Sequence, residues 1–281
     1  MFITMEDIDR MIREDIPYLD LTSRVLGIRE QRGSVTYFTR EDCVASGVRE
    51  VEQVFARLGV KLSWRVEPGE RVRAGAGLIA GEGRAEDLHM AWKVGQNILD
   101  HCCGIATRTR AMVDAAAEVN PRLAILTTRK MFPGTKTLAT GAIVDGGALP
   151  HRLGISETIL IFHQHMEFSG GPEAVAARLE GIKGPCCEKK VIVEASSAEE
   201  AELFCRAGAD GIQLDKLPLP ELEDLTRDLK KRYPSVILLA AGGISEKNVK
   251  EYARLSLDGV VTSSLYHAKP VDIGVRMKSH G

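Results

Sequence analysis

Residues 191–215 read VIVEASSAEEAELFCRAGADGIQLD, and this stretch decides the fold. It begins with a short apolar run, 191–193, and ends with another, 211–214, while residues 198–207 between them repeat apolar positions at helical spacing. Near-continuous apolar runs are typical of strands that are buried on both faces of a parallel sheet. The stretch therefore predicts a strand, a helix and a second, parallel strand.

The same rhythm recurs on both sides of this stretch. Apolar runs alternate with helical patterns such as residues 219–232; the runs occupy residues 123–126, 158–162, 191–193, 211–214, 236–239 and 259–261. Strands that alternate with helices at spacings of about twenty residues or more fit a βα barrel. We therefore expect an α/β fold in which this part of the chain forms such a barrel.

Polar residues and glycines follow each of these runs. They are, in chain order, Arg129 and Lys130, His163 and His165, Glu194, Asp215, Gly242 and Gly243, and Ser263 and Ser264. In a βα barrel all of these positions lie on one rim. Carboxylates suit Mg²⁺, glycine amides suit phosphate, and cations suit the remaining negative charge. The set predicts a site for a phosphorylated ligand.

The stretch from residue 127 to residue 152, TTRKMFPGTKTLATGAIVDGGALPHR, adds to the positive charge of this rim. Its cations are Arg129, Lys130, Lys136, His151 and Arg152. Lysines and arginines near helix ends are often merely solvated. Here they flank strand ends instead of covering one helical face, which favours an anion site.

Structural explanations compete at several of these positions. A carboxylate after a strand can cap the next helix, and paired glycines can form a plain turn. If residues 163–165 are extended, both imidazoles lie on one strand face and can bind a metal, but the spacing supplies no third ligand. Packing or substrate contact is the favoured alternative for these histidines.

The N-terminal third of the chain lacks the βα rhythm. A helix is expected over 5–16, a turn at 20–23, a strand over 33–39, a helix over 47–58 and a strand over 60–66. Tight turns follow, and then two helical patterns over 88–119 with a break near Gly104. These patterns predict a separate α+β unit that ends near Gly104.

Composition excludes several classes of partner. The 281 residues are 44% hydrophobic, and 37 Lys and Arg against 39 Asp and Glu give a net charge of −2 with no charged block. This balance argues against nucleic-acid and membrane partners. The acidic start, without a signal-peptide core, predicts a cytoplasmic protein. The six cysteines lack C-x-x-C and zinc-ligand spacing, which indicates free thiols.

Six ordered motifs resemble those of one enzyme family. They are TTRKMFPGTK, GGALPHRLGI, LIFHQH, VIVEAS, GADGIQLDKL and AAGGI, and REDIPYLDLTS and CGIATRTR extend the match towards the N-terminus. In this order and spacing they resemble the quinolinate phosphoribosyltransferase family, the nicotinate-nucleotide pyrophosphorylases of NAD synthesis. TTRKMFPGTK and SETILIFHQH are most similar to the ModD branch, which is encoded with molybdenum transport genes.

The resemblance implies both an architecture and a reaction. It implies an N-terminal α/β sandwich domain over 1–104, an incomplete TIM-like βα barrel over 105–266, and a tail over 267–281 that returns to the first domain. It further implies a homodimer with shared active sites, in which one subunit's N-terminal domain closes the other's barrel mouth. The family reaction joins a ring nitrogen of a pyridine acid to C1 of 5-phosphoribosyl-1-diphosphate, with Mg²⁺, and releases diphosphate.

The resemblance also assigns roles to residues of the rim. It implies carboxylate binding by Arg129, His151 and Arg152, catalysis by Lys130, Glu194 and Asp215, contact of Glu194 and Asp215 with Mg²⁺, binding of the 5-phosphate by Gly242 and Gly243, and a second phosphate loop at Ser263 and Ser264. The family typically has glycine in that second loop. A carboxylate near C1 can stabilise an oxocarbenium-like transition state.

Two departures from the family pattern lie in the acceptor half of the site. His101 stands where the family has an arginine that reaches the partner's substrate, and Phe162 stands where it has a lysine. His163 and Gln164 replace the next aspartate and asparagine. A charged hydrogen bond contributes roughly 1.5–3 kcal/mol, so the loss of two such bonds weakens the binding of a dicarboxylate by about 3–6 kcal/mol, or roughly 10²–10⁴-fold. A protonated His101 would restore part of the energy of one of these two hydrogen bonds.

These observations predict phosphoribosyl transfer to a nitrogen heterocycle acid that is less anionic or more aromatic than quinolinate. One alternative is a true quinolinate phosphoribosyltransferase. A second is a non-catalytic oxyanion-binding protein of molybdenum metabolism, which the two carboxylates disfavour because an oxyanion sensor has no use for them. A third is a transition-metal site formed by His163, His165 and a carboxylate.

Overall fold

The computed structural model describes residues 3–280. The chain divides into two compact units, of which the first comprises Met1–Arg110, Met131–Gly147 and Tyr266–Gly281, and the second comprises Ala111–Lys130 and Ala148–Leu265. The domain boundaries expected from the sequence, at residues 104 and 266, stay a prediction. The two units differ from those boundaries mainly because residues 131–147 lie with the first unit. No helix within residues 3–280 is long and apolar enough to cross a membrane.

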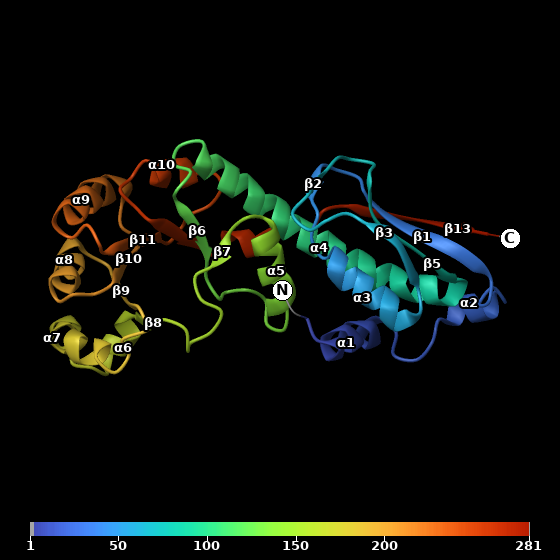
Figure 1. Cartoon of the computed structure of the whole chain (residues 1–281), viewed down its shortest axis with the longest axis horizontal. Helices are drawn as coiled ribbons and strands as arrows, with labels where there is room; N and C mark the ends of the chain where they lie inside the picture. Colours follow the sequence, from blue (N-terminus) through green and yellow to red (C-terminus); the bar gives the residue numbers. More distant parts are fainter. Residues whose placement is uncertain (1–2, 281) are drawn as a thin grey trace. The chain divides into compact units, whose positions relative to one another are not determined.

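The centre of the first unit is a four-stranded antiparallel sheet (Figure 1). Its order is β13 (Ile273–Ser279), β1 (Arg32–Thr39), β5 (Gly77–Arg84) and β3 (Lys61–Arg65). The last strand of the chain thus pairs with the first, and Tyr37 lies opposite Val275. A short ribbon of β2 (Cys43–Val44) and β4 (Arg71–Val72) accompanies this sheet.

Five helices contribute to the first unit: α1 (Met5–Asp15), α2 (Leu21–Val25), α3 (Val48–Leu58), most of α4 (Ala85–Ala117) and α5 (Lys136–Asp145). The helix α3 forms because Val51, Val54 and Phe55 recur on one face, and all three are fully buried. The hydroxyl of Tyr37, also buried, donates a hydrogen bond of 2.8 Å to the Ala91 carbonyl of α4. These contacts form one apolar core within the unit.

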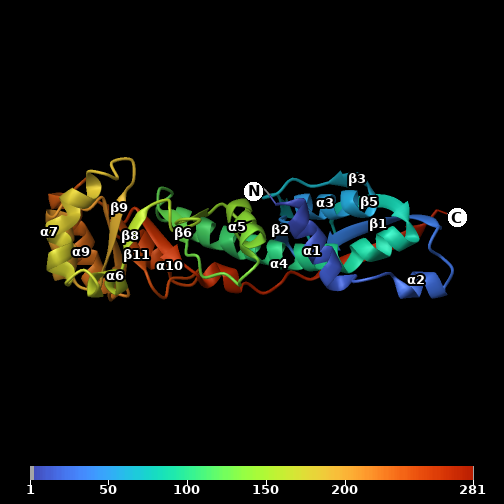
Figure 2. The same cartoon turned by 90° about the horizontal axis from the view of Figure 1, so that it is seen from below.

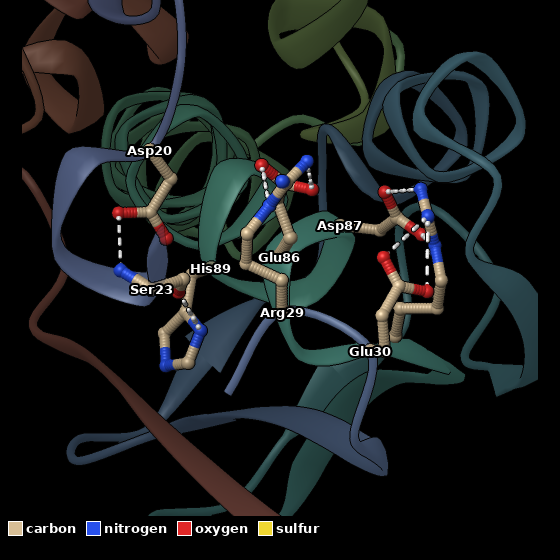
Figure 3. Close-up of polar contacts among 8 residues, drawn as sticks. Asp20, Ser23, Arg29, Glu30, Glu86, Asp87 and His89 are labelled. Carbon is tan, nitrogen blue, oxygen red and sulfur yellow. Dashed lines mark hydrogen bonds and ion pairs between the residues drawn. The ribbon is translucent and has the colours of Figure 1, made fainter. Parts of the chain in front are cut away.

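A polar network fixes the segment before β1 to the start of α4 (Figure 3). Arg29 binds both oxygens of Glu86, at 2.9 and 2.8 Å, and Arg84 binds Asp87 in the same bidentate manner at 2.8 and 3.0 Å. The hydrogen bond from Arg29 lowers the pKa of Glu86. Acidic side chains in the first turn also suit the positive end of the helix dipole. The network therefore anchors the N-terminal end of a 33-residue helix.

A seven-stranded sheet dominates the second unit. Its order is β7 (Leu149–Pro150), β6 (Ala124–Thr127), β12 (Gly259–Thr262), β11 (Ile237–Ala241), β10 (Gly211–Asp215), β9 (Val191–Ala195) and β8 (Ile159–Ile161), and neighbouring strands run parallel. The strands follow one another as in a barrel, but β7 and β8 remain as edges. The predicted α/β fold with an incomplete βα barrel is therefore confirmed.

Helices cover the outside of this half-barrel (Figures 1 and 2). The helix α8 (Ala198–Arg206) packs on β9 and β10, with α7 (Pro172–Lys183) and α9 (Leu219–Arg232) beside it. Ser197 caps α8, since its side chain accepts from the backbone N–H of Glu200. The short elements α6 (His163–Glu167), α10 (Val249–Ala253) and a 3₁₀ turn, Ser264–His267, complete the set.

Two local predictions were wrong. Residues 20–23 do not form a simple turn, because Asp20 accepts from Ser23 N–H at 3.1 Å and caps the helix α2. The helix α4 runs unbroken past Gly104. A β-carbon at Gly104 would lie 2.4 Å from the Lys269 carbonyl oxygen. The glycine therefore allows the backbone of Lys269 to approach the helix closely, and it does not interrupt the helix. The extended conformation that would have placed both imidazoles on one strand face is not found, since residues 163–165 begin the helix α6.

Candidate active site in the half-barrel

A cavity of about 850 Å³ opens at the carboxyl ends of the parallel strands. Its walls come from strand ends of the half-barrel and from the loops that follow the strands; they include Thr127, Thr128, Arg129, Lys130, His151, Arg152, Leu160, Phe162, Gln164, Glu194, Gln213, Asp215, Lys216, Gly242, Gly243, Ser245, Ser263 and Ser264. Ligand sites of βα folds lie at this end because the strand-to-helix loops converge there. The cavity thus joins residues that are more than 130 positions apart, such as Lys130 and Ser263.

One wall of the cavity is cationic and is formed by Arg129, Lys130, His151 and Arg152. The β6–β7 pairing brings them together, because His151 N–H donates to the Thr127 carbonyl at 2.9 Å. Burial and the neighbouring Arg129 lower the pKa of Arg152. A guanidinium whose pKa is lowered by burial and by a second cation indicates a site prepared for an anion.

His151 has an unusual environment in this wall. Its Nε2 atom is buried and has no hydrogen-bond partner within residues 3–280. Burial, and then the Arg152 guanidinium, lower the pKa of its imidazole. A buried nitrogen without a partner is costly, so its partner is expected to be a bound ligand.

The opposite wall carries two carboxylates on neighbouring strands, Glu194 on β9 and Asp215 on β10. The Gln213 amide donates to Glu194 Oε2 at 3.0 Å and so orients the carboxylate. Burial, and then the Asp215 charge, raise the pKa of Glu194. Two carboxylates that repel each other in a cavity create a position where a cation is stabilised.

Carboxylates such as Glu194 and Asp215 are the type of side chain that would hold a Mg²⁺ ion. Among residues 3–280 no group of three or more His, Cys, Asp or Glu side chains is placed to hold a metal alone. Protein Mg²⁺ sites of the substrate-bridged type need only one or two carboxylates, with phosphate oxygens and water as the remaining ligands. Within the same residues, His163 and His165 therefore do not belong to a group of three side chains that could hold a transition metal.

A glycine loop after β11 forms the third wall. Gly242 and Gly243 both have positive φ, +95° and +69°, which other residues adopt only with strain. The loop is held by Asn248, whose amide donates to the Gly243 carbonyl at 3.1 Å. Hydroxyls lie nearby: Ser263 Oγ and Thr128 Oγ1 are 2.7 Å apart. Loops of this type present backbone N–H groups to phosphate.

His163 lies beside the cavity, although it was predicted to bind substrate. It is not among the lining residues, and its ring sits between Glu200, at 3.1 Å from Nε2, and Glu194, at 3.6 Å from Nδ1. Burial alone lowers the pKa of its imidazole, but the hydrogen bonds and negative charges of Glu200 and Glu194 together outweigh burial, and the net pKa is raised. The His163 ring therefore contacts the Glu194 carboxylate from outside the cavity lining.

His101 belongs to the other unit. It lines a separate cavity of about 630 Å³ within the first unit, together with apolar residues such as Ile98 and Phe132. Its predicted role in substrate binding stays a prediction.

Polar lining residues that were not selected from the sequence include Thr128, Gln164, Gln213, Lys216 and Ser245. Gln213 had a usable signal, because it is a polar residue inside an apolar strand and shares a strand face with Asp215. The sequence contains no comparable signal for Lys216. In the structure its positive φ of 57° marks it as an unusual loop residue. Gln164 enters the cavity only because the chain turns into α6 there.

Comparison with known proteins identifies the class. The chain matches the model of the quinolinate phosphoribosyl transferase N-terminal domain over residues 20–103 and that of the C-terminal domain over residues 105–276. The protein belongs to the quinolinate phosphoribosyltransferase family and is a phosphoribosyltransferase. Members of this family bind phosphoribosyl diphosphate and a heterocyclic acid.

Particular relatives place it nearer one branch. It is 33% identical over 275 residues to the protein named pyrophosphorylase ModD in Pasteurella multocida, with 98% of each chain covered. It is 30% identical over 276 residues to the carboxylating nicotinate-nucleotide pyrophosphorylase of Mycobacterium leprae, covering 96% and 95% of the two chains. The crystal structure of NadC from Streptococcus pyogenes superposes with a TM-score of 0.89 at 25% identity over the whole of both chains. The predicted resemblance to the ModD branch is confirmed.

Proposed function

We propose that this enzyme transfers the phosphoribosyl group of 5-phosphoribosyl-1-diphosphate, with Mg²⁺, to the ring nitrogen of a heterocyclic acid that is less anionic than quinolinate. The observation that carries the proposal is the composition of one cavity. Its cations, carboxylates and glycine loop are those expected for phosphoribosyl transfer, while Phe162 stands in its wall in place of the family's lysine.

In the proposed reaction, the acceptor nitrogen forms a bond to C1 of the ribose. The bond from C1 to the diphosphate oxygen breaks, and diphosphate leaves with the electron pair. Glu194, whose carboxylate is oriented by Gln213, is proposed to stabilise the positive charge that develops on the ribose. A Mg²⁺ ion held by Glu194 and Asp215 would neutralise charge on the leaving diphosphate.

The other walls bind the two ends of the substrates. The N–H groups of the Gly242–Gly243 loop and the hydroxyls of Ser263 and Ser264 are proposed to bind the phosphates. Arg129 and Arg152 are proposed to bind the acceptor carboxylate, and His151 supplies the buried nitrogen that lacks a partner within the described residues. Lys130, at the end of β6, is proposed to add positive charge near the reacting groups.

Quinolinate itself is the second candidate acceptor. It is favoured by the four cationic or titratable residues of the wall, which exceed what one carboxylate requires. The non-catalytic alternative is not retained, since the family is one of enzymes. From the family resemblance we also propose a cytoplasmic homodimer in which His101 reaches the acceptor bound by the partner subunit.

The test is release of diphosphate from 5-phosphoribosyl-1-diphosphate in the presence of Mg²⁺. Quinolinate, nicotinate and a panel of azine and azole acids would be compared, with Glu194→Gln as the blank. We expect release with a monoacid and only slow release with quinolinate. Rapid turnover of quinolinate would overturn the proposed acceptor, and release that persists in Glu194→Gln would overturn the proposed role of this carboxylate.

A further inference from the structure

A second cavity, of about 830 Å³, adjoins the active-site cavity within the same unit. The two share Arg129, Arg152, Leu160 and Phe162 as lining residues. The rest of the second cavity comes from β8, α6, α7 and residues 155–158 and 186–189. It lies at the open edge of the half-barrel, because β8 is an edge strand.

The lining of this second cavity is apolar, with cations among it. Ile159, Ile161, Val175 and Ile182 supply aliphatic surface, and Val175 is 4% exposed. Arg178 and Lys189 join the shared Arg129 and Arg152, while Glu157 is the one acidic residue in the lining. Within residues 3–280 none of these four cations forms an ion pair with a carboxylate. An apolar surface with unpaired cations suits an apolar group that ends in an anion.

Phe162 stands in the shared wall and is held there. Its backbone N–H donates to His165 Nδ1 at 2.9 Å, and the two rings stack with centroids 5.8 Å apart and planes inclined by 24°. The Arg152 guanidinium lies 5.7 Å from the ring centroid on which it stacks. An aromatic ring so fixed presents an apolar surface where a lysine would present a charge, so the passage between the cavities is suited to an apolar group.

We propose that the second cavity is a subsite for a substituent of the acceptor. The acceptor is then an extended aromatic acid. Its nitrogen ring and carboxylate lie in the first cavity, and an apolar substituent passes Phe162 to lie on Ile159, Ile161 and Val175. A distal anionic group on that substituent would face Arg178 and Lys189. This inference rests on the proposed function, because it describes the substrate of the same site.

The test compares compact and extended acids on the full-length protein. Titration calorimetry would give dissociation constants for nicotinate, for its phenyl-substituted positional isomers, and for the same isomers with a carboxylate on the phenyl ring. Each additional ring buries apolar surface, so at least one phenyl isomer is expected to bind about 10- to 100-fold more tightly than nicotinate. The added carboxylate is expected to tighten binding further, by about tenfold.

Variants locate the effect in the second cavity. Ile182→Trp on α7 fills it and is expected to remove the advantage of the phenyl isomers over nicotinate. Arg178→Glu is expected to remove only the advantage of the distal carboxylate. Lys231→Glu, a charge reversal at the end of α9 and outside both cavities, serves as the control and is expected to change neither ratio. Because Arg178 is exposed, its replacement tests the proposal even if Ile182→Trp fails to fold.

The outcomes separate this inference from the proposed function. If no extended acid binds more tightly than nicotinate while diphosphate is released with a compact acid, the subsite is wrong and the transfer stands. If extended acids bind with the expected sensitivity to Ile182→Trp but no heterocycle releases diphosphate, the cavity is a ligand site and the transfer is wrong. If the extended acids keep their full affinity advantage over nicotinate in both Ile182→Trp and Arg178→Glu, the proposed subsite is wrong.

Discussion

Phe162 is the single residue that most separates this site from the family pattern. Its ring lies in the wall shared by the two cavities, under Arg152 and stacked on His165. A dicarboxylate bound there meets an apolar ring where the family offers an ammonium group. The acceptor preference is therefore expected to depend on this one side chain.

Replacing Phe162 by lysine tests that dependence. Because a charged hydrogen bond contributes roughly 1.5–3 kcal/mol, the Phe162→Lys protein is expected to bind quinolinate about 10- to 100-fold more tightly. The measurement is the dissociation constant by calorimetry. Phe162→Leu, which removes the ring without adding charge, is the control and is expected to give no gain. Equal affinities in the lysine and leucine variants would show that this position does not determine acceptor charge.

His151 is a second residue with a measurable signature. Its folded-state pKa is lowered by burial and by Arg152, so in the free protein it stays neutral to lower pH than the ordinary value of about 6.5. An acceptor carboxylate beside the ring raises the pKa again, and binding then takes up a proton. Affinity for quinolinate is therefore expected to rise as the pH falls from about 8 to about 6.

Calorimetry in buffers of different ionisation enthalpy would count the protons taken up on binding. His151→Gln keeps an N–H donor but does not titrate, and it is expected to lose the pH dependence while it retains part of the affinity. The lowered pKa of His151 also makes the stability of the free protein depend on pH. Since the folded state disfavours the protonated ring, His151 reduces the stability of the free protein as the pH falls through about 6.5. Proton uptake that persists in His151→Gln would assign it to another group.

At the scale of elements, the loops after β10 and β11 determine each other's shape. Gly242 follows β11 with a φ of +95°, and a β-carbon there would lie 2.4 Å from Lys216 Cγ and 3.1 Å from the Lys216 nitrogen. Lys216 itself has a φ of 57° and follows Asp215 directly. The glycine loop after β11 and the loop that follows Asp215 therefore pack directly on each other.

Gly242→Ala is expected to disturb both loops. The strain amounts to about 1–3 kcal/mol, and the displaced Lys216 shifts Asp215, so both unfolding free energy and diphosphate release should fall. Gly243→Ala is the matched control, since a β-carbon there meets nothing within 4 Å and adds only the cost of its φ of +69°. Urea unfolding and the diphosphate assay would be run on both. Equal losses of activity in the two variants would contradict the proposed packing.

At the scale of the whole molecule, separate apolar clusters lie in the two units. The core of the first unit includes Tyr37, Phe55 and Ile273, whereas Leu160, Ile192, Leu239 and Val261 form a cluster in the second unit. The first core depends on β13, which the chain supplies only at its end. Stability is therefore expected to be distributed unevenly between the units.

Ile273→Asp would expose this difference. Ile273 is 1% exposed, and an aspartate there buries a charge in the first core at a cost of several kcal/mol. Hydrogen exchange is expected to accelerate in β1 and β5 while β9 to β12 stay protected. Lys278→Asp, on the exposed part of the same strand, is expected to change little. Equal loss of protection in both sheets would mean that the units unfold together.

The sequence by itself determined the repeated strands and helices of the half-barrel, because apolar periodicity is a local property of neighbouring residues. It also placed cations, carboxylates and glycines after the correct strands. The rim residues chosen from the sequence line the cavity except Lys136, His163 and His165, and Lys136 begins the helix α5 of the first unit. Local patterns sufficed there because parallel strands bring their carboxyl ends to one edge.

Only the tertiary structure decided the remaining features. The pairing of β13 with β1, the unbroken α4 and the gap between β7 and β8 depend on contacts between residues far apart in the chain. At Gly104 the approach of Lys269 explains a glycine that local rules assign to a break. The entry of Gln164 and Lys216 into the first cavity, and the second cavity beside Phe162, likewise follow from packing. Side-chain direction is set by the neighbours that the fold supplies, which no local pattern contains.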